Sequence, residues 1–235
     1  MNTLLHLIYK NSKRISVLCL ASFWLLIAHP ASAMDIQCDL PENNRINPAI
    51  INTMLEAADK GYFYRVDTSI SNVNFQVKHF PFSTLKGRFN EFDGGLALPV
   101  DTDQSRQILF LIKVSSMATG DHDMDDYLKS TVFFNAAQFP DIIFVSTGFE
   151  WINETTARLH GELTLRGTTR PLVFNVHINT TESYDIEQSQ KMTMIANAEI
   201  KRSEFGMHEL PLLVSDTVRF NLNIEATRVG RSDLI

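Results

Sequence analysis

The densest group of chemically reactive side chains in the sequence is the acidic run at residues 121–126. Aspartates occupy its first, third and fifth positions, as they do in a calcium-binding loop. Such a loop needs glycine at its sixth position and glutamate at its twelfth, where this chain has Asp126 and Val132. We therefore predict no metal site here, and we interpret the run as the acidic first turn of a helix from Asp121 to Lys129.

The histidines and potential nucleophiles show no known catalytic or zinc-binding pattern. No histidine pair has the His-Glu-x-x-His spacing of a zinc helix, and the chain has no Gly-x-Ser-x-Gly elbow, Cys-x-x-Cys pair or phosphate-binding glycine loop. The histidines beyond residue 33 are His79, His122, His160, His177 and His208. We therefore assign no catalytic residue, metal or cofactor, and we predict a protein that is not an enzyme.

The first 33 residues are typical of a secretory signal peptide. Lys10, Lys13 and Arg14 are followed by a charge-free apolar run from Ile15 to Ala28. This run is shorter than the roughly 20 apolar residues that span a bilayer. The small residues at 31–33 suit a signal peptidase. We expect export, cleavage after Ala33 and no stable membrane span in the mature chain.

Charge and cysteine content limit the partners of the exported chain. The full chain has a formal charge of −6, and removal of the basic signal peptide makes it more acidic. An acidic surface repels phosphates, so we predict no nucleic-acid partner. Cys38 is the only cysteine beyond the signal peptide, which excludes an internal disulfide. We interpret Cys38 as an incidental thiol; the alternative is intermolecular pairing, which would give a homodimer.

Residues 34–61 form an N-terminal extension with one predicted helix. Asn47 can cap this helix, Pro48 suits its first position and Gly61 marks its end. Apolar residues recur along one face, namely Ile50, Ile51, Met54, Leu55 and Ala58. Since an apolar face must be buried, we expect the helix to pack on the outside of the neighbouring domain or to close one end of it.

From Tyr62 onward, apolar residues alternate with polar ones, which indicates strands with one dry and one wet face. The segments at 108–114 and 142–145 are apolar on both faces and should lie beneath another element such as a helix. Residues 87–98 have the pattern of a strand broken at Asp93-Gly94-Gly95. About eight long strands of this kind favour a sheet that closes on itself and leaves no exposed edge.

Short blocks in the barrel segment have a specific order and spacing. They include Tyr64-Arg65-Val66-Asp67, Gly87-Arg88-Phe89, and the stretches at 73–79, 139–144, 161–169 and 202–207. In this arrangement the chain resembles the YceI-like family of bacterial, mostly periplasmic, lipocalin-like proteins. The family usually has a histidine–serine pair where this chain has Ile70-Ser71. We assign residues 62–228 to one barrel domain, followed by a tail at 229–235.

The resemblance implies a mostly β protein with a closed, eight-stranded, antiparallel lipocalin-like barrel and one or two short helices, located in the periplasm. It also implies a long apolar cavity that holds an isoprenoid or quinone-like lipid or a similar amphiphile. These side chains could instead fill the barrel completely, but the resemblance favours a hollow interior. The dry strand faces supply the candidate lining: Phe75, Val77, Phe110, Ile112, Phe144, Leu163, Leu165, Phe174, Val176, Met194, Phe220 and Leu222.

Two polar residues are candidates for contacts at the mouth of the barrel. His79 ends a strand with a dry face, so it could contact a ligand; the alternative is a solvated histidine. Arg202 could bind a polar or phosphate head group through charged hydrogen bonds. The alternative for Arg202 is a salt bridge to Glu204, Asp216 or another acid.

The sequence supports three hypotheses of function. We expect an exported carrier or store for a long apolar isoprenoid or fatty ligand. A lipid-modifying barrel enzyme is the first alternative, and it needs a polar constellation that the candidate lining lacks. An envelope-stress or adhesion factor that acts through its outer surface, such as the helix from Pro48 to Lys60, is the second alternative.

Overall fold

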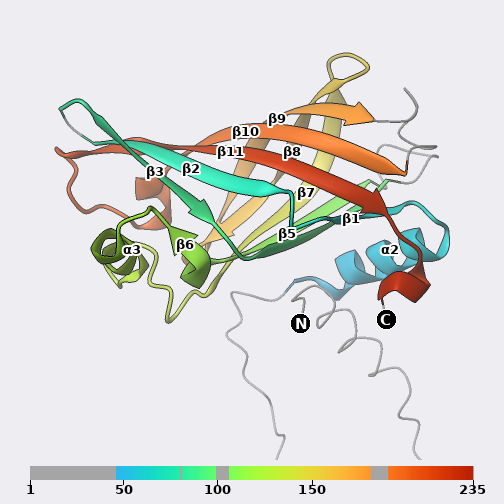
Figure 1. The fold of residues 1–235 in the computed structure, drawn as a ribbon, viewed down its shortest axis with the longest axis horizontal. Helices are drawn as coiled ribbons and strands as arrows, with labels where there is room; N and C mark the ends of the chain where they lie inside the picture. Colours follow the sequence, from blue (N-terminus) through green and yellow to red (C-terminus); the bar gives the residue numbers. More distant parts are fainter. Residues whose placement is uncertain (1–45, 80, 99–105, 181–189, 235) are drawn as a thin grey trace, which may run out of the picture.

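The computed structural model describes residues 46–79, 81–98, 106–180 and 190–234 (Figure 1). The predicted signal peptide, its cleavage site after Ala33 and Cys38 lie outside the described residues. Within those residues, no helix combines the length and the apolar character needed to cross a membrane.

Strands make up most of the described chain. They are β1 (Phe63–Val66), β2 (Asn72–His79), β3 (Ser83–Phe89), β4 (Phe92–Ala97), β5 (Gln107–Lys113), β6 (Met117–Ala118), β7 (Asp141–Trp151), β8 (Thr156–Leu165), β9 (Thr168–Thr180), β10 (Lys191–Lys201) and β11 (Val214–Arg228). The helices are α2 (Pro48–Asp59) and α3 (His122–Lys129), and the short 3₁₀ turns are η4 (Val114–Ser116), η5 (Arg202–Phe205) and η6 (Arg231–Leu234).

Eight of these strands form a closed ring in the order β1-β4-β5-β7-β8-β9-β10-β11, and β11 pairs with β1 to complete it. Every pair in the ring is antiparallel. The predicted closed, eight-stranded, antiparallel barrel is therefore confirmed. Figure 1 shows α3 and α2 near opposite ends of this barrel.

Strand β11, the longest strand, pairs with two different strands along one of its edges. Residues 226–228 of β11 pair with β1, whereas residues 214–223 pair with β2. Strand β2 forms a hairpin with β3, and β3 pairs with the short β6. The β2–β3 hairpin therefore extends the wall beyond β1 at the α3 end of the molecule (Figure 1).

Burial along the strands follows the predicted period of two. In β10, the even-numbered residues from Met192 to Ile200 are buried, and the odd-numbered residues are exposed or half-buried. Successive side chains of a strand point to opposite faces of the sheet, so the buried set faces the interior. The predicted break at Asp93-Gly94-Gly95 is wrong, because β4 runs through these residues and the break falls at Asn90 and Glu91.

Helix α2 lies on the outside of the barrel, over β1, β4 and β5. Asn47 caps it, with its side chain accepting a hydrogen bond from the Ala49 N–H at 2.9 Å. The apolar face of α2 is buried against the outer face of the wall in a cluster of Ile51, Met54, Ala57, Ala58, Phe63, Ala97, Leu109, Leu111 and Ile143. This packing confirms the predicted helix and explains why β5 and β7 are apolar on both faces.

Candidate ligand-binding cavity

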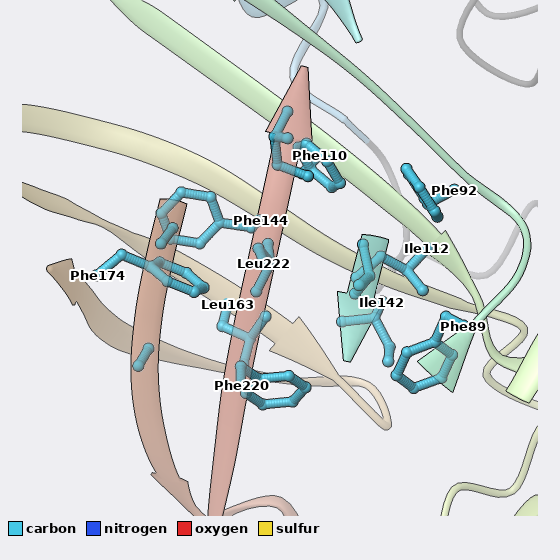
Figure 2. Packing of buried hydrophobic residues seen from close by; sticks show 14 of the residues in the cluster. Phe89, Phe92, Phe110, Ile112, Ile142, Phe144, Leu163, Phe174, Phe220 and Leu222 are labelled. Carbon is cyan, nitrogen blue, oxygen red and sulfur yellow. The ribbon is translucent and has the colours of Figure 1, made fainter. Parts of the chain in front are cut away.

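The inward faces of the strands enclose a cavity that we call the deep cavity. Figure 2 shows Phe110, Phe144 and Phe174 projecting from different strands into the same interior. The rings of Phe144 and Phe174 meet edge to face, with centroids 5.1 Å apart. Every side chain that lines the deep cavity is hydrophobic: Val73, Ile108, Phe110, Ile112, Ile142, Phe144, Leu159, Leu163, Leu172, Phe174, Met194, Ala196, Phe220 and Leu222.

A second cavity, which we call the capped cavity, lies between the barrel and α3. It adjoins the deep cavity, because Phe220 lines both. Its lining includes the polar residues His79, Tyr127 and Arg202. The other lining residues are Phe75, Val77, Leu85, Met124, Leu128, Phe133, Phe134, Leu165, Ile200, Met207, Leu210, Val214 and Val218.

Side chains fill much of both cavities. The lining atoms of the deep cavity leave about 570 Å³ of empty space, part of it continuous with solvent, and about 40 Å³ of it is open to the centre of a water molecule. In the capped cavity the empty space is about 780 Å³, and about 100 Å³ of it is open to the centre of a water molecule. A single buried water needs about 10–15 Å³ of the space that is open to water centres. A long ligand can therefore enter only if lining side chains move aside.

Three interior phenylalanines lie directly against glycines of neighbouring strands. A Cβ atom built on any of these glycines would stand between 2.3 and 2.7 Å from an atom of the phenylalanine ring, closer than real Cβ atoms approach. Each glycine therefore gives its ring space at the wall and leaves more of the lumen free, which is one reason for glycine inside a strand. The pairs are Phe75 with Gly87, Phe110 with Gly94 and Phe144 with Gly161.

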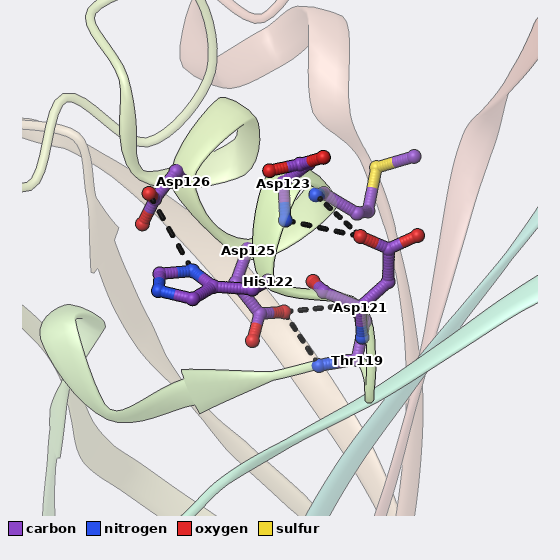
Figure 3. A network of polar contacts seen from close by, with 7 residues as sticks. Thr119, Asp121, His122, Asp123, Asp125 and Asp126 are labelled. Carbon is purple, nitrogen blue, oxygen red and sulfur yellow. Dashed lines mark hydrogen bonds and ion pairs between the residues drawn. The ribbon is translucent and has the colours of Figure 1, made fainter.

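Helix α3 caps one end of the barrel and is held there by its acidic first turn (Figure 3). The Asp121 carboxylate accepts hydrogen bonds from the N–H groups of Asp123 and Met124 at 3.0 and 3.1 Å. The Asp125 carboxylate accepts hydrogen bonds from the N–H and the hydroxyl of Thr119 at 2.6 and 2.7 Å, which joins α3 to the segment that follows β6. This arrangement confirms the predicted helix.

The electrostatics of the acidic run fit a helix cap. Burial alone would raise the pKa of Asp125, but the hydrogen bonds from Thr119 outweigh it and lower this pKa below its usual value. His122 and Asp126 face each other on the exposed side of α3, 3.5 Å apart. In the described part of the chain, no three histidine, cysteine or acidic side chains are arranged to hold a metal ion.

Arg202 is buried beside the capped cavity, where it binds the protein's own backbone. Its guanidinium donates hydrogen bonds to the carbonyl oxygens of Met207 at 2.7 Å, Val214 at 3.1 Å and Ser215 at 3.1 Å. The Asp216 carboxylate instead accepts hydrogen bonds from the N–H and the hydroxyl of Ser203. Arg202 therefore fixes the loop between η5 and β11, a role that neither sequence hypothesis for this residue included.

His79 lies at the end of β2, on the edge of the capped cavity. Its side chain is exposed, and its Nδ1 atom is 3.3 Å from the hydroxyl of Ser83 across the β2–β3 hairpin. His79 is thus both solvated and adjacent to the cavity, so the structure keeps it as a candidate contact for a polar group of a ligand.

The structure divides the predicted lining residues between the two cavities. The deep cavity takes Phe110, Ile112, Phe144, Leu163, Phe174, Met194 and Leu222, the capped cavity takes Phe75, Val77 and Leu165, and Phe220 belongs to both. Val176 is buried in the same core but lines neither cavity. The predicted set is therefore brought together around one interior.

Sequence reasoning missed lining residues of two kinds. Some, such as Val73, Leu159 and Ile200, lie on the same dry faces as predicted residues and could have been found by extending the alternation. Others belong to α3, to the segment after it or to the loop before β11. For α3, the spacing of Met124 and Leu128 by one helical turn was the available signal.

A closed, eight-stranded, antiparallel barrel with an apolar interior places the protein in the lipocalin-like class of β-barrels. Within this class, the chain belongs to the YceI-like family, because a model of the YceI-like domain matches residues 64–226. A UPF0312 protein of Shewanella denitrificans is 27% identical over 181 residues, which cover 76% of this chain and 92% of the relative.

Solved structures share this fold. The Burkholderia cenocepacia protein BcnA matches with a TM-score of 0.62 and 22% identity, over 69% of this chain and 99% of its own. A Campylobacter jejuni YCEI protein matches with a TM-score of 0.57 and 25% identity, over 64% and 89% of the two chains. A Saccharophagus degradans domain, described as polyisoprenoid binding and implicated in plant cell wall breakdown, matches with a TM-score of 0.53 and 16% identity, over 70% and 98%.

Proposed function

We propose that this protein binds a long apolar ligand of the isoprenoid or fatty type inside its barrel, and that it carries or stores this ligand without transforming it. The observation that carries the proposal is the wholly hydrophobic lining of the deep cavity, which adjoins the capped cavity at Phe220. The neighbour described as a polyisoprenoid-binding domain has the same fold, which supports the same class of ligand.

The lining also explains how a ligand could displace side chains on entry. Each CH₂ group transferred from water to the interior contributes about 0.8 kcal/mol, and this gain can drive the rearrangement of rings. The cost of ordering the ligand offsets part of the gain. Met194 in the deep cavity and Met124 and Met207 in the capped cavity are flexible side chains that can adapt to chains of different shape.

The two cavities suit the two ends of an amphiphile. The apolar tail would occupy the deep cavity, and a polar head would lie in the capped cavity near His79 and Tyr127. Arg202 already donates to three carbonyls, so we expect it to shape this end of the site rather than to bind the head directly.

We further propose that the protein works in the periplasm. The signal-like residues 1–33 and the resemblance to mostly periplasmic proteins support this location. An aqueous compartment between two membranes is a place where a lipid with a long apolar tail needs a protein shell.

Extraction of the purified protein with organic solvent, followed by mass spectrometry, tests the proposal directly. We expect a co-purified prenyl or acyl lipid, or uptake of added geranylgeraniol or palmitate detected by native mass spectrometry. A protein that carries no lipid and takes up neither compound would refute the proposal. Chemical conversion of an added lipid would favour the lipid-modifying enzyme instead.

A matched pair of variants in β10 locates the binding site. Ala196 lines the deep cavity and is 2% exposed, whereas the adjacent Ile195 points outward and is 43% exposed. Ala196→Trp should fill the cavity and remove lipid binding, and Ile195→Trp should leave binding unchanged. The milder Ala196→Leu provides a graded result if the tryptophan variant does not fold.

A further inference from the structure

Two loops at the α3 end of the barrel present apolar side chains to solvent. Phe82, in the β2–β3 loop, is 99% exposed, and Leu212 and Leu213, in the loop before β11, are 87% and 48% exposed. His79 of β2 pairs with Val214 of β11, which brings the two loops side by side. Figure 1 shows the β2–β3 hairpin and the start of β11 projecting together beyond the rest of the barrel. We call Phe82, Leu212 and Leu213 the apolar tip.

The local backbone directs these leucines outward. Leu210 has a positive φ of 53°, which is uncommon for a residue with a side chain. Its carbonyl accepts hydrogen bonds from the N–H groups of Leu213 at 3.0 Å and Val214 at 2.9 Å. The side chain of Leu210 packs against the core, whereas Leu212 beyond Pro211 is exposed. The turn thus anchors one leucine inside and presents the next ones to solvent.

The two loops carry little charge. Among their described residues, 79, 81–83 and 209–213, Glu209 is the only acid and there is no lysine or arginine. The three side chains of the tip carry no charge, and exposed Lys78 directly precedes the first loop, so the tip itself does not attract an ionic surface. The chemistry of the tip favours an apolar medium with an uncharged or zwitterionic surface.

The surface area of the tip indicates whether its partner is a bilayer or a protein. A buried aromatic side chain contributes at most about 250 Å², so Phe82 and the two smaller leucines together offer less than about 750 Å². A specific protein interface needs about 800 Å² from each partner. A convex tip of this size is too small for a stable interface with a second copy of the chain, whereas insertion into a bilayer requires no complementary surface.

We propose that the apolar tip inserts into the surface of a phospholipid bilayer and brings the capped cavity to the lipid interface. His79, Leu210 and Val214, at the base of the two loops, line the capped cavity, so the tip adjoins the end of this cavity. The role of this docking in lipid exchange rests on the proposed function, but docking itself does not depend on it.

Flotation with vesicles of phosphatidylcholine and phosphatidylethanolamine tests the proposal. The wild-type protein should float with these vesicles, and raising the salt concentration should change this little. The double variant Phe82→Asp, Leu212→Asp should bind at least about tenfold more weakly, because two exposed apolar side chains no longer enter the lipid. The matched control is Ile152→Asp: Ile152 is 52% exposed in the β7–β8 turn at the opposite end of the barrel, and this variant should float like wild type.

Three results would overturn the proposal: wild-type protein that does not float, an equal loss for Ile152→Asp, or self-association that needs the tip and occurs without vesicle binding. Circular dichroism establishes that the variants fold. Uptake of geranylgeraniol by the double variant in vesicle-free solution separates this proposal from the proposed function. Normal uptake with lost flotation supports docking, whereas absent uptake by the wild type would count against the carrier function alone.

Discussion

The deep cavity and the capped cavity differ in how their walls are built. The faces of long, hydrogen-bonded strands form nearly all of the deep cavity, and its lining is wholly hydrophobic. The capped cavity combines the ends of the ring strands β8, β10 and β11 with the β2–β3 hairpin, α3, η5 and nearby loops, and its lining includes His79, Tyr127 and Arg202. One barrel thus combines an apolar interior with a more polar end.

The two regions also differ in what stabilises them. Continuous strand pairing around the ring supports the deep cavity. At the capped end, hydrogen bonds between side chains and backbone take over, and these are made by Arg202, Asp125 and Asp216. The capped end should therefore open at lower cost than the ring, as is common for segments that admit ligands.

Removal of the Arg202 guanidinium should have the largest effect on the stability of the capped end relative to the ring. In Arg202→Met, three carbonyls at a partly buried site lose charged donors, so we expect the free energy of unfolding to fall by at least about 3 kcal/mol. Urea unfolding measures the loss, and hydrogen exchange should show it first at Met207 and Val214. Unchanged stability with a loss of lipid binding would instead assign Arg202 to the ligand head group.

A methyl group at Gly161 should have an intermediate effect, and it tests the deep cavity. The new Cβ atom would stand 2.3 Å from the ring of Phe144 and 2.5 Å from the carbonyl oxygen of Val145, so the ring must move into the lumen and the backbone of β7 must shift. We expect Gly161→Ala to cost about 1–3 kcal/mol of stability and to weaken lipid binding. A Cβ atom on Gly148 meets no atom within 4 Å, so Gly148→Ala is the matched control. Equal effects of the two variants would show that the contact between Phe144 and Gly161 is unimportant.

Loss of the Asp125 carboxylate should have the smallest effect, and this effect should depend on pH. The folded protein holds the pKa of Asp125 below its usual 3.8, because the hydrogen bonds from Thr119 outweigh burial. The stabilisation is thus complete above about pH 3.8 and is lost as the pH falls through the lowered pKa. At neutral pH, Asp125→Asn should cost about 1 kcal/mol.

The pH dependence of this variant distinguishes a carboxylate effect from a general defect. Denaturant unfolding of wild type and Asp125→Asn should give a difference that shrinks in acid, as the wild-type carboxylate becomes protonated. Asp126→Asn is the control: Asp126 faces only His122 on the exposed side of α3, so we expect a change of about 0.5 kcal/mol or less. A difference between wild type and Asp125→Asn that does not change with pH would contradict this account.

Sequence patterns alone predicted both helices and the dry faces of the long strands. Alternation assigned the buried residues of β10, and the cap residues Asn47 and Asp121 located both helices. The two-sided apolar character of β5 and β7 predicted that another element covers them, but the sequence left open whether the first helix packs on the outside or closes one end; the structure places α2 on the outside. The helices and dry faces were predictable because strand and helix periodicity is local and depends only on nearby residues.

The contacts between distant segments became visible in the folded structure alone. It divided β11 between β1 and β2, placed the ring of Phe110 over Gly94 and so allowed glycine inside β4, and gave Arg202 its carbonyl partners. It also filled much of the interior with side chains, which alternation could not distinguish from a hollow tube. The physical reason is that alternation fixes the direction of a side chain, whereas its neighbours and the space they leave depend on strand register and on packing across the barrel.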